Sequence, residues 1–167
     1  YKGAYEFSPP VYSRETVTTN FNDLTVKLSK YDAITPSDIS INIQQGEKMA
    51  KAALTAHYSY KFKNKNKGVD VRLFAGTFIS TNAFDAGAYR FRLSGQTGYQ
   101  DYLYDNVFLG RSEREEVLSQ QFTETDGAFK FYSPLGQSSQ WVAALNIKSS
   151  LGNMKLPINL YADIGTA

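Results

Sequence analysis

The residues in this chain that could do chemistry are few and poorly placed for catalysis. There is one histidine, His57, and no cysteine. Catalytic zinc sites usually need two or three imidazole or thiolate ligands, so a zinc hydrolase is not supported. His57 also has no nucleophile motif around it, which argues against a Ser-His-Asp triad. The carboxylates that could form acid–base pairs cluster at Asp101, Asp105, Glu113, Glu115 and Glu116. No base, nucleophile or metal-binding set accompanies them, so the sequence predicts no catalytic residue, no metal and no cofactor.

A second group of polar side chains lies within segments in which polar and apolar residues alternate. Its charged members are Arg72, Arg90, Arg92 and Asp163, and His57 falls on the same polar face. In a soluble sheet these would be ordinary surface charges. In a barrel whose outer face meets lipid they would point into the lumen, where opposite charges can pair. The four charges are therefore candidate lumenal residues.

The elements expected to position these residues are β-strands. Apolar and polar residues alternate with a period of two, which is typical of strands with two different faces. The alternating segments are 24–28, 39–44, 54–62, 69–79, 89–93, 127–132, 141–148 and 158–164. Residues 1–22, which contain Pro9-Pro10, are expected to be irregular, and 96–121 to form a long loop. The sequence predicts one all-β domain over 23–167, with roughly eight meandering antiparallel strands.

Composition excludes several classes of function. The net charge of +2 over 167 residues gives no broad basic field, so nucleic acid is not an expected partner. No apolar run approaches the ~20 residues of a transmembrane helix. Mean hydropathy is −0.39, a slightly polar value that strands with one polar and one apolar face would also give.

Two interpretations of the alternation remain open. In a soluble β-barrel or sandwich the apolar face is the core. In a transmembrane barrel the apolar face meets lipid and the polar face lines the lumen. Strands near ten residues, and aromatic residues near strand ends such as Tyr60, Phe62 and Tyr89, favour the second interpretation. Alanines on the apolar face favour it too, because they would fill a sandwich core poorly.

The C-terminal part adds a family resemblance. Its segments, in order, are Asp101–Asp105 (DYLYD), Phe108–Arg111 (FLGR), Leu118–Phe122 (LSQQF), Asp126–Lys130 (DGAFK), Trp141–Lys148 and Leu156–Gly165. Together with Arg72–Gly76 (RLFAG), this order resembles the C-terminal barrel of the bacterial surface-antigen (BamA-type) family. It is most similar to the variant that follows a zinc-aminopeptidase-like domain in some outer-membrane proteins. The resemblance covers residues 69–166.

The resemblance implies a loop that folds back into the lumen, carrying Arg111, Gln120, Gln121 and Phe122. In the family, an Arg-Gly-Phe motif in this loop forms an ion pair with a lumenal acid. Gln120-Gln121-Phe122 occupies that motif here, and glutamine can offer only a neutral hydrogen bond. Arg111 is the residue that could supply a charge from elsewhere in the loop.

The predicted function is that of a non-enzymatic segment of a β-barrel in the bacterial outer membrane. It would act as a membrane anchor or as a translocation or assembly pore, and any peptidase activity would lie in a separate domain. The implied partners are outer-membrane lipid and, beyond it, a polypeptide or another envelope protein. Because the family barrel continues past the strand that ends at Gly165, the chain is expected to be a fragment. The alternative is a soluble β-barrel or sandwich that binds a small apolar or glycan ligand.

Overall fold

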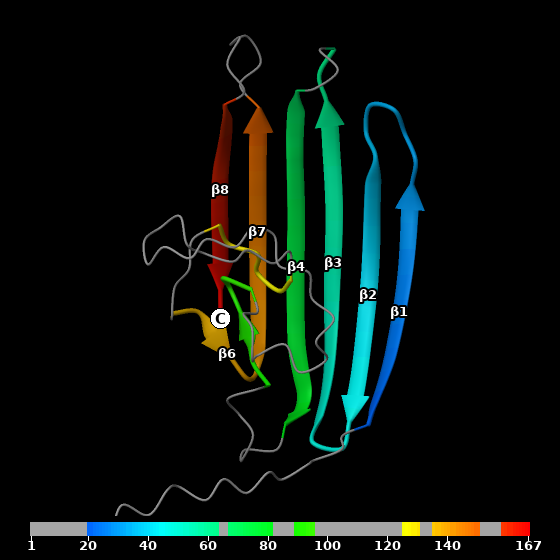
Figure 1. Ribbon diagram of the computed structural model, residues 1–167, viewed down its shortest axis with the longest axis vertical. Coiled ribbons are helices and arrows are strands. Elements are labelled where there is room, and N and C mark those ends of the chain that lie inside the picture. Colours follow the sequence, from blue (N-terminus) through cyan, green and yellow to red (C-terminus); the bar gives the residue numbers. More distant parts are fainter. Residues whose placement is uncertain (1–19, 64–66, 82–88, 96–124, 131–134, 151–157) are drawn as a thin grey trace, which may run out of the picture.

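The protein is an all-β structure dominated by one antiparallel sheet. The computed structural model describes residues 20–63, 67–81, 89–95, 125–130, 135–150 and 158–167. Six strands form the main sheet, in the order β1-β2-β3-β4-β7-β8 (Figure 1). They are β1 (Phe21–Lys30), β2 (Ser37–Gly46), β3 (Met49–Lys61), β4 (Gly68–Thr81), β7 (Trp141–Ser150) and β8 (Asn159–Thr166). The sheet is a meander, except that the chain leaves it after β4 and returns as β7.

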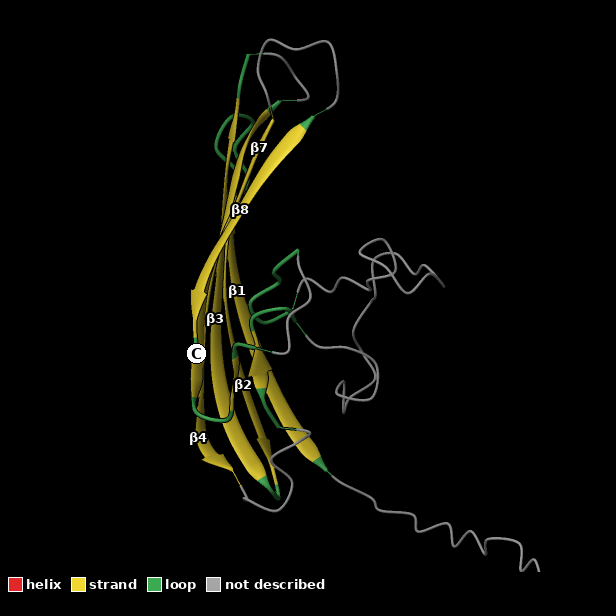
Figure 2. Ribbon diagram, turned by 90° about the vertical axis from the view of Figure 1, so that its left-hand side faces the viewer, coloured by secondary structure: helices red, strands yellow, loops and turns green. Residues whose placement is uncertain are grey.

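A small second sheet lies within the connection between β4 and β7. It pairs β5 (Phe91–Arg92) with β6 (Gln137–Ser138). Figure 2 shows the described parts of this connection on one side of the main sheet, on the inside of its curve. Below, "the insert" means the described residues 89–95, 125–130 and 135–140 of this connection.

The pairing register keeps the side-chain alternation in phase across all six strands. In an antiparallel pair, residues directly opposite one another point to the same face. One cross-strand row is wholly polar, and consists of Ser29, Asp38, His57, Arg72, Asn146 and Asp163. The neighbouring row, on the other face, is wholly apolar, and consists of Leu28, Ile39, Ala56, Leu73, Leu145 and Ile164. The sheet therefore has one polar and one apolar face.

Short turns fix this register at both ends of the sheet. Glu47 and Lys48 alone connect β2 to β3. At the opposite end, Oδ1 of Asp32 accepts hydrogen bonds from the backbone N–H groups of Ile34 (2.8 Å) and Thr35 (3.3 Å), an arrangement typical of Asx turns. These bonds hold the pKa of Asp32 below its ordinary value of 3.8. The ionised carboxylate lies 3.6 Å from the Lys30 ammonium.

The buried core lies on the polar face, beneath the insert. Phe91 of β5 is only 1% exposed and packs against Phe74, Val142 and Ala144 of the sheet. Its ring lies edge-on to the ring of Phe74, with 5.7 Å between centroids. Gly76 provides the space, because a Cβ there would lie 2.7 Å from Cζ of Phe91. In the view of Figure 1 the insert thus lies in front of the lower parts of β4, β7 and β8.

Leu93 is the second anchor of the insert, and glycines surround it. A Cβ on Gly165 of β8 would lie 2.5 Å from Cδ2 of Leu93, and one on Gly127 would lie 2.4 Å from its carbonyl oxygen. Leu93 also donates its N–H to the carbonyl of Gly136, and its own carbonyl accepts from Phe129, both at 2.9 Å. Side chains larger than glycine at these positions would push the insert away from the sheet.

The fold corrects two strand predictions. Alternation predicted a strand over 127–132, but up to Lys130 the described chain is a turn, with Asp126 and Ala128 at φ 50° and 48°. Alternation also predicted a strand over 89–93, and β5 contains only two of those residues. Phe91 and Arg92 are both buried, so their polar–apolar alternation does not mark an exposed and a buried face.

The prediction of antiparallel all-β structure is confirmed, while the sheet itself is open. Its edges are β1 and β8, and no pairing joins them in the part of the chain that the structure describes. Across the same residues, no helix is long and apolar enough to cross a membrane.

Packing of Phe91 on Gly76 predicts a face-specific effect of substitution. Gly76→Val should force the Phe91 ring off the sheet, at a cost of about 1–3 kcal/mol for overpacking. Amide exchange at Leu93, measured by hydrogen–deuterium exchange, should then speed up. The matched control is Ala75→Val, one residue away on the exposed apolar face, which should leave this exchange unchanged. Equal effects of the two variants would contradict the packing described.

Candidate functional site

The most unusual surface of the molecule is its apolar face, which nothing in the described structure covers. Its large side chains remain exposed on every strand, with Leu28 of β1 at 72% and Ile164 of β8 at 63%. The exposed set on the sheet includes Leu24, Val26, Leu28, Ile39, Ile41, Ile43, Tyr58, Tyr60, Leu73, Trp141, Leu160 and Ile164. The face is continuous, because each of these residues belongs to a cross-strand row of the same register.

This face is larger than the apolar patches that soluble monomers usually expose. Six strands about 4.8 Å apart are ~24 Å wide, and ten residues at about 3.3 Å each extend ~33 Å, which gives ~800 Å². Soluble monomers rarely expose a contiguous apolar patch of more than a few hundred Å². A surface of this kind normally contacts another apolar phase, whether protein or lipid.

Aromatic side chains bound the apolar face at both ends. Tyr60 lies opposite Val69 near one end of β4, and Trp141 lies opposite Thr77 near the other. Val69 and Thr77 are separated by ~26 Å along the strand, or ~20 Å along an axis to which the strand is tilted by about 40°. Smaller residues, among them Ala52, Ala75 and Ala143, line a shallow groove of about 390 Å³ between these ends.

The polar face carries a hydrogen-bonded network along the row that contains Arg72 and Asp163. Nη1 of Arg72 donates to Oδ1 of Asn146 (3.1 Å), and Nδ2 of Asn146 donates to Oδ1 of Asp163 (2.9 Å). The structure thus brings together two of the four predicted lumenal charges, through an asparagine between them that sequence analysis did not single out. Arg90 and Arg92 lie instead on the insert, and Arg92 is buried.

The same network attaches the insert to the sheet. The backbone N–H of Lys130 donates to Oδ2 of Asp163, and Nδ2 of Asn146 donates to the carbonyl of Gly127, each at 2.9 Å. Two sheet residues therefore hold the turn at 126–130 in place through polar contacts. Apolar contacts of Phe91 and Leu93 with the same face of the sheet add to this attachment.

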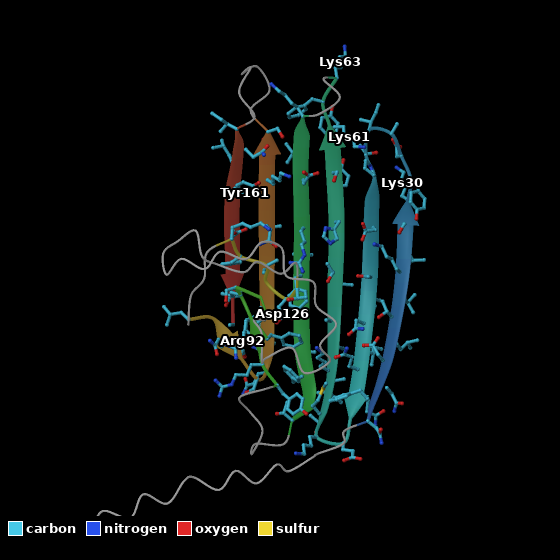
Figure 3. The ribbon with its side chains drawn as sticks, viewed as in Figure 1. Lys30, Lys61, Lys63, Arg92, Asp126 and Tyr161 are labelled. Carbon is cyan, nitrogen blue, oxygen red and sulfur yellow. The ribbon has the colours of Figure 1, made fainter. Side chains whose placement is uncertain are left out.

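Asp126 is the buried carboxylate at the centre of this attachment. It is 6% exposed, and its Oδ2 accepts a hydrogen bond from the backbone N–H of Arg92 (3.2 Å). Burial raises the pKa of Asp126 from 3.8 to about 6, although the nearby charges of Lys51, Arg72 and Arg92 act in the opposite direction. All three cations are themselves buried. Figure 3 shows Asp126 and Arg92 in front of the sheet, on the side of the insert.

The charges of this cluster come from both the insert and the sheet. The carboxylate belongs to the insert, and two of the nearby cations, Lys51 and Arg72, belong to β3 and β4. Sequence analysis missed this cluster, although the Asp126-Gly127 pair is a turn signal that could have marked it. The predicted loop residues Arg111, Gln120, Gln121 and Phe122 lie outside the described residues, as do Asp101, Asp105, Glu113, Glu115 and Glu116.

A polar pocket of about 270 Å³ adjoins the insert. It lies between the sheet and the turn at 126–130, with His57, Arg72, Asp70 and Tyr161 among its lining residues. Basic and acidic side chains both line it, so it is suited to water or a polar solute rather than to an apolar ligand. Among the residues that the structure describes, no group of three or more His, Cys, Asp or Glu side chains could hold a metal ion.

The raised pKa of Asp126 predicts that acid favours docking of the insert. The docked state binds the proton more tightly than a solvated aspartate does, so this contribution is fully present below about pH 4 and is lost as the pH rises through 6. Its size is on the order of 3 kcal/mol. The Asp126 carboxyl carbon, followed by ¹³C NMR, should titrate near pH 6, and Leu93 should be better protected from exchange at pH 5 than at pH 8.

Asp126→Asn is the direct test of that assignment, because an amide does not titrate in this range. The variant should lose the NMR transition and most of the difference in protection between pH 5 and pH 8. Protection that increases from pH 5 to pH 8 in the unmodified chain would contradict the assignment.

Comparison of this chain with protein-family models, with curated proteins and with solved structures gives no match.

Proposed function

We propose that this chain is a non-enzymatic segment of a β-barrel in the bacterial outer membrane, with its apolar face toward lipid and its polar face toward a lumen that the insert partly fills. The observation that carries the proposal is the exposed apolar face, which extends over all six strands on the side away from the insert. Lipid is the occupant that fits this face best.

The position of the core supports this orientation. In a soluble antiparallel sheet with one covered face, the covering element lies on the apolar side. Here the insert lies on the polar side, where Phe74, Phe91, Val142 and Ala144 form the buried cluster. The large aliphatic residues stay outside. Contact with acyl chains would remove this apolar surface from water without any covering protein layer.

The dimensions of the face support lipid as its occupant. Transmembrane strands need ~9–11 residues when tilted, and β1, β2 and β7 have ten residues each. Tyr60 and Trp141 flank an apolar band of ~20–26 Å, near the ~25 Å of outer-membrane barrels, which aromatic girdles also bound. Charged side chains of the central rows all belong to the polar face, where a lumen would hydrate them.

The open edges set a requirement on any such barrel. In lipid, unpaired N–H and C=O groups at β1 and β8 would each cost several kcal/mol, so further strands must pair with both edges. Barrels of this class have at least about eight strands, and six are seen here. The proposal therefore requires additional strands beside β1 and β8.

Within such a barrel, the insert would narrow the lumen. It rests on β4, β7 and β8 through Phe91 and Leu93, and through the hydrogen bonds that join the turn at 126–130 to Asn146 and Asp163. The described insert does not lie in front of β1 and β2 in Figure 1. A barrel plugged on one side in this way is compatible with an anchor and with a gated passage for a polypeptide.

Neighbouring residues on β2 offer a test of which face meets lipid. Ile41 lies in the central row of the apolar face and is 46% exposed, and Ser40 lies on the polar face. In lipid vesicles, Ile41→Lys should lower the free energy of unfolding by about 2–4 kcal/mol, because it buries a charge near the membrane midplane. Ser40→Lys should change it by less than about 1 kcal/mol. Urea titration monitored by Trp141 fluorescence measures both values.

A soluble domain would respond differently. Lysine at the half-exposed position 41 would then point into water and cost little. Equal and small effects of Ile41→Lys and Ser40→Lys would therefore contradict a lipid-facing surface.

Recovery from cells provides an independent test. The chain is expressed together with the strands that pair with β1 and β8. We expect it to resist extraction by alkaline carbonate and to require detergent for solubility. In flotation assays it should rise with phosphatidylcholine vesicles. A stable monomer in detergent-free buffer, absent from the floated fraction, would overturn the proposal and would favour a soluble sheet that binds an apolar ligand.

A further inference from the structure

The polar pocket beside the insert has no role in the function proposed above. It has a volume of about 270 Å³ and lies between the sheet and the turn at 126–130. The cross-strand row that contains Asp70, Lys148 and Tyr161 forms part of its floor, next to the row that contains Arg72 and Asp163. Figure 3 shows Tyr161 on β8, above the insert in this view. The pocket therefore opens on the polar face, where the insert ends.

Hydrogen bonds fix the walls of this pocket on both sides. Arg72 is 8% exposed, and its Nη1 donates to Oδ1 of Asn146. Asn146 and Asp163 in turn bind the carbonyl of Gly127 and the N–H of Lys130, which belong to the insert. A ligand would meet walls that are in place before it binds, so its binding would cost little conformational entropy of the protein.

The lining carries one more positive than negative charge when its histidine is neutral. Its charged side chains are three cations and two carboxylates, namely Arg72, Lys130, Lys148, Asp70 and Asp163. Both carboxylate oxygens of Asp163 already accept hydrogen bonds. Within the described chain, no ion pair joins Lys130 or Lys148 to a carboxylate. Two ammonium groups, one from the insert and one from β7, are thus available to an anionic ligand.

We propose that this pocket binds a small hydrophilic carboxylate, about the size of a sugar acid, with the Lys130 and Lys148 ammonium groups contacting its carboxylate and the Tyr161 hydroxyl contacting its hydroxyl groups. A single negative charge balances the lining, whereas a phosphate monoester would bring almost two beside Asp70 and Asp163. The volume suits a small solute, because pockets for drug-sized ligands have about 300–1,000 Å³. The inference needs only the sheet and the docked insert, so it goes beyond the proposed function and does not depend on lipid.

The first test measures binding to the full chain in micelles of an uncharged polyoxyethylene detergent, with NMR detection at the backbone amides of Lys148 and Tyr161. The probe is D-glucuronate, and its matched control is D-glucose, which has the same ring but no charge. We expect glucuronate to shift both amides. Glucose should bind at least about tenfold more weakly, because it lacks the carboxylate that the ammonium groups contact. Glucose 6-phosphate should also bind more weakly than glucuronate.

Substitutions test whether binding occurs in this pocket. Lys148→Gln should weaken glucuronate binding by about tenfold, and Lys148→Arg should preserve it, since guanidinium also binds carboxylates. The matched control is Lys27→Gln, which removes the same charge from the polar face of β1, outside the pocket, and should leave the affinity unchanged. Equal weakening by Lys27→Gln and Lys148→Gln would overturn the site, because it would show a response to net charge alone.

A ligand that contacts both lysines should also stabilise docking of the insert, because Lys130 belongs to the insert and Lys148 to the sheet. At a glucuronate concentration of ten times the Kd, exchange of the Leu93 amide should slow by about tenfold. Lys130→Gln/Lys148→Gln should remove this effect. Unchanged exchange at Leu93, with shifts at Lys148 and Tyr161, would overturn a site that joins the two elements.

The remaining outcomes decide the chemistry of the ligand. Glucuronate that shifts neither amide, or that binds no more tightly than glucose, would overturn the proposed carboxylate site. Tighter binding of glucose 6-phosphate would overturn it in favour of a phosphate. A chain that binds glucuronate as expected but does not float with vesicles would overturn the membrane proposal and leave this site intact.

Discussion

The structure depends on one constraint, which is that side-chain alternation stays in register across six strands. A slip of a single residue between two strands would move every apolar side chain beyond that point to the opposite face. The two-residue β2–β3 turn and the Asx turn at Asp32 limit such slips at both ends of the N-terminal strands. The one irregularity in the described pairing of the main sheet lies between Ala50 and Lys51, close to a strand end, so the two faces stay in phase across the central rows. Both the exposed apolar surface and the docking surface for the insert depend on this separation.

Alternation was sufficient to predict the long strands, because a period of two is a local property. Segments such as 54–62 and 69–79 agree with β3 and β4 in this way. It failed where the chain leaves the main sheet. In the described part of 127–132, Ala128 is buried and Phe129 packs against the core cluster, and the positive φ angles of Asp126 and Ala128 make this part of the chain a turn. Nothing local distinguishes such a packed turn from a strand.

The candidate site could be predicted only in part, for a related reason. Arg72 and Asp163 were identified from their places on polar faces, but their common row depends on the β4–β7 and β7–β8 registers, which are not local properties of the sequence. Asp126 was missed as a site residue because its importance comes from burial against Lys51 and Arg72, which lie far away in the sequence. The roles proposed for Arg111, Gln120, Gln121 and Phe122 stay predictions.

The long connection between β4 and β7 also has consequences for how the chain folds. β4 and β7 are hydrogen-bonded neighbours, yet the pairing of Thr77 with Trp141 closes a loop over residues 78–140. Closing it costs ~3 kcal/mol more in chain entropy than closing a two-residue turn. Hairpin formation among β1, β2, β3 and β4 needs no such closure, so these strands are expected to pair first. During that interval the β4 edge, with its backbone groups unpaired and aliphatic side chains beside it, could pair with a strand of another molecule. The long connection between β4 and β7 carries the insert on the polar face. Because it also delays the pairing of β4 with β7, it prolongs the time during which the β4 edge is open to aggregation.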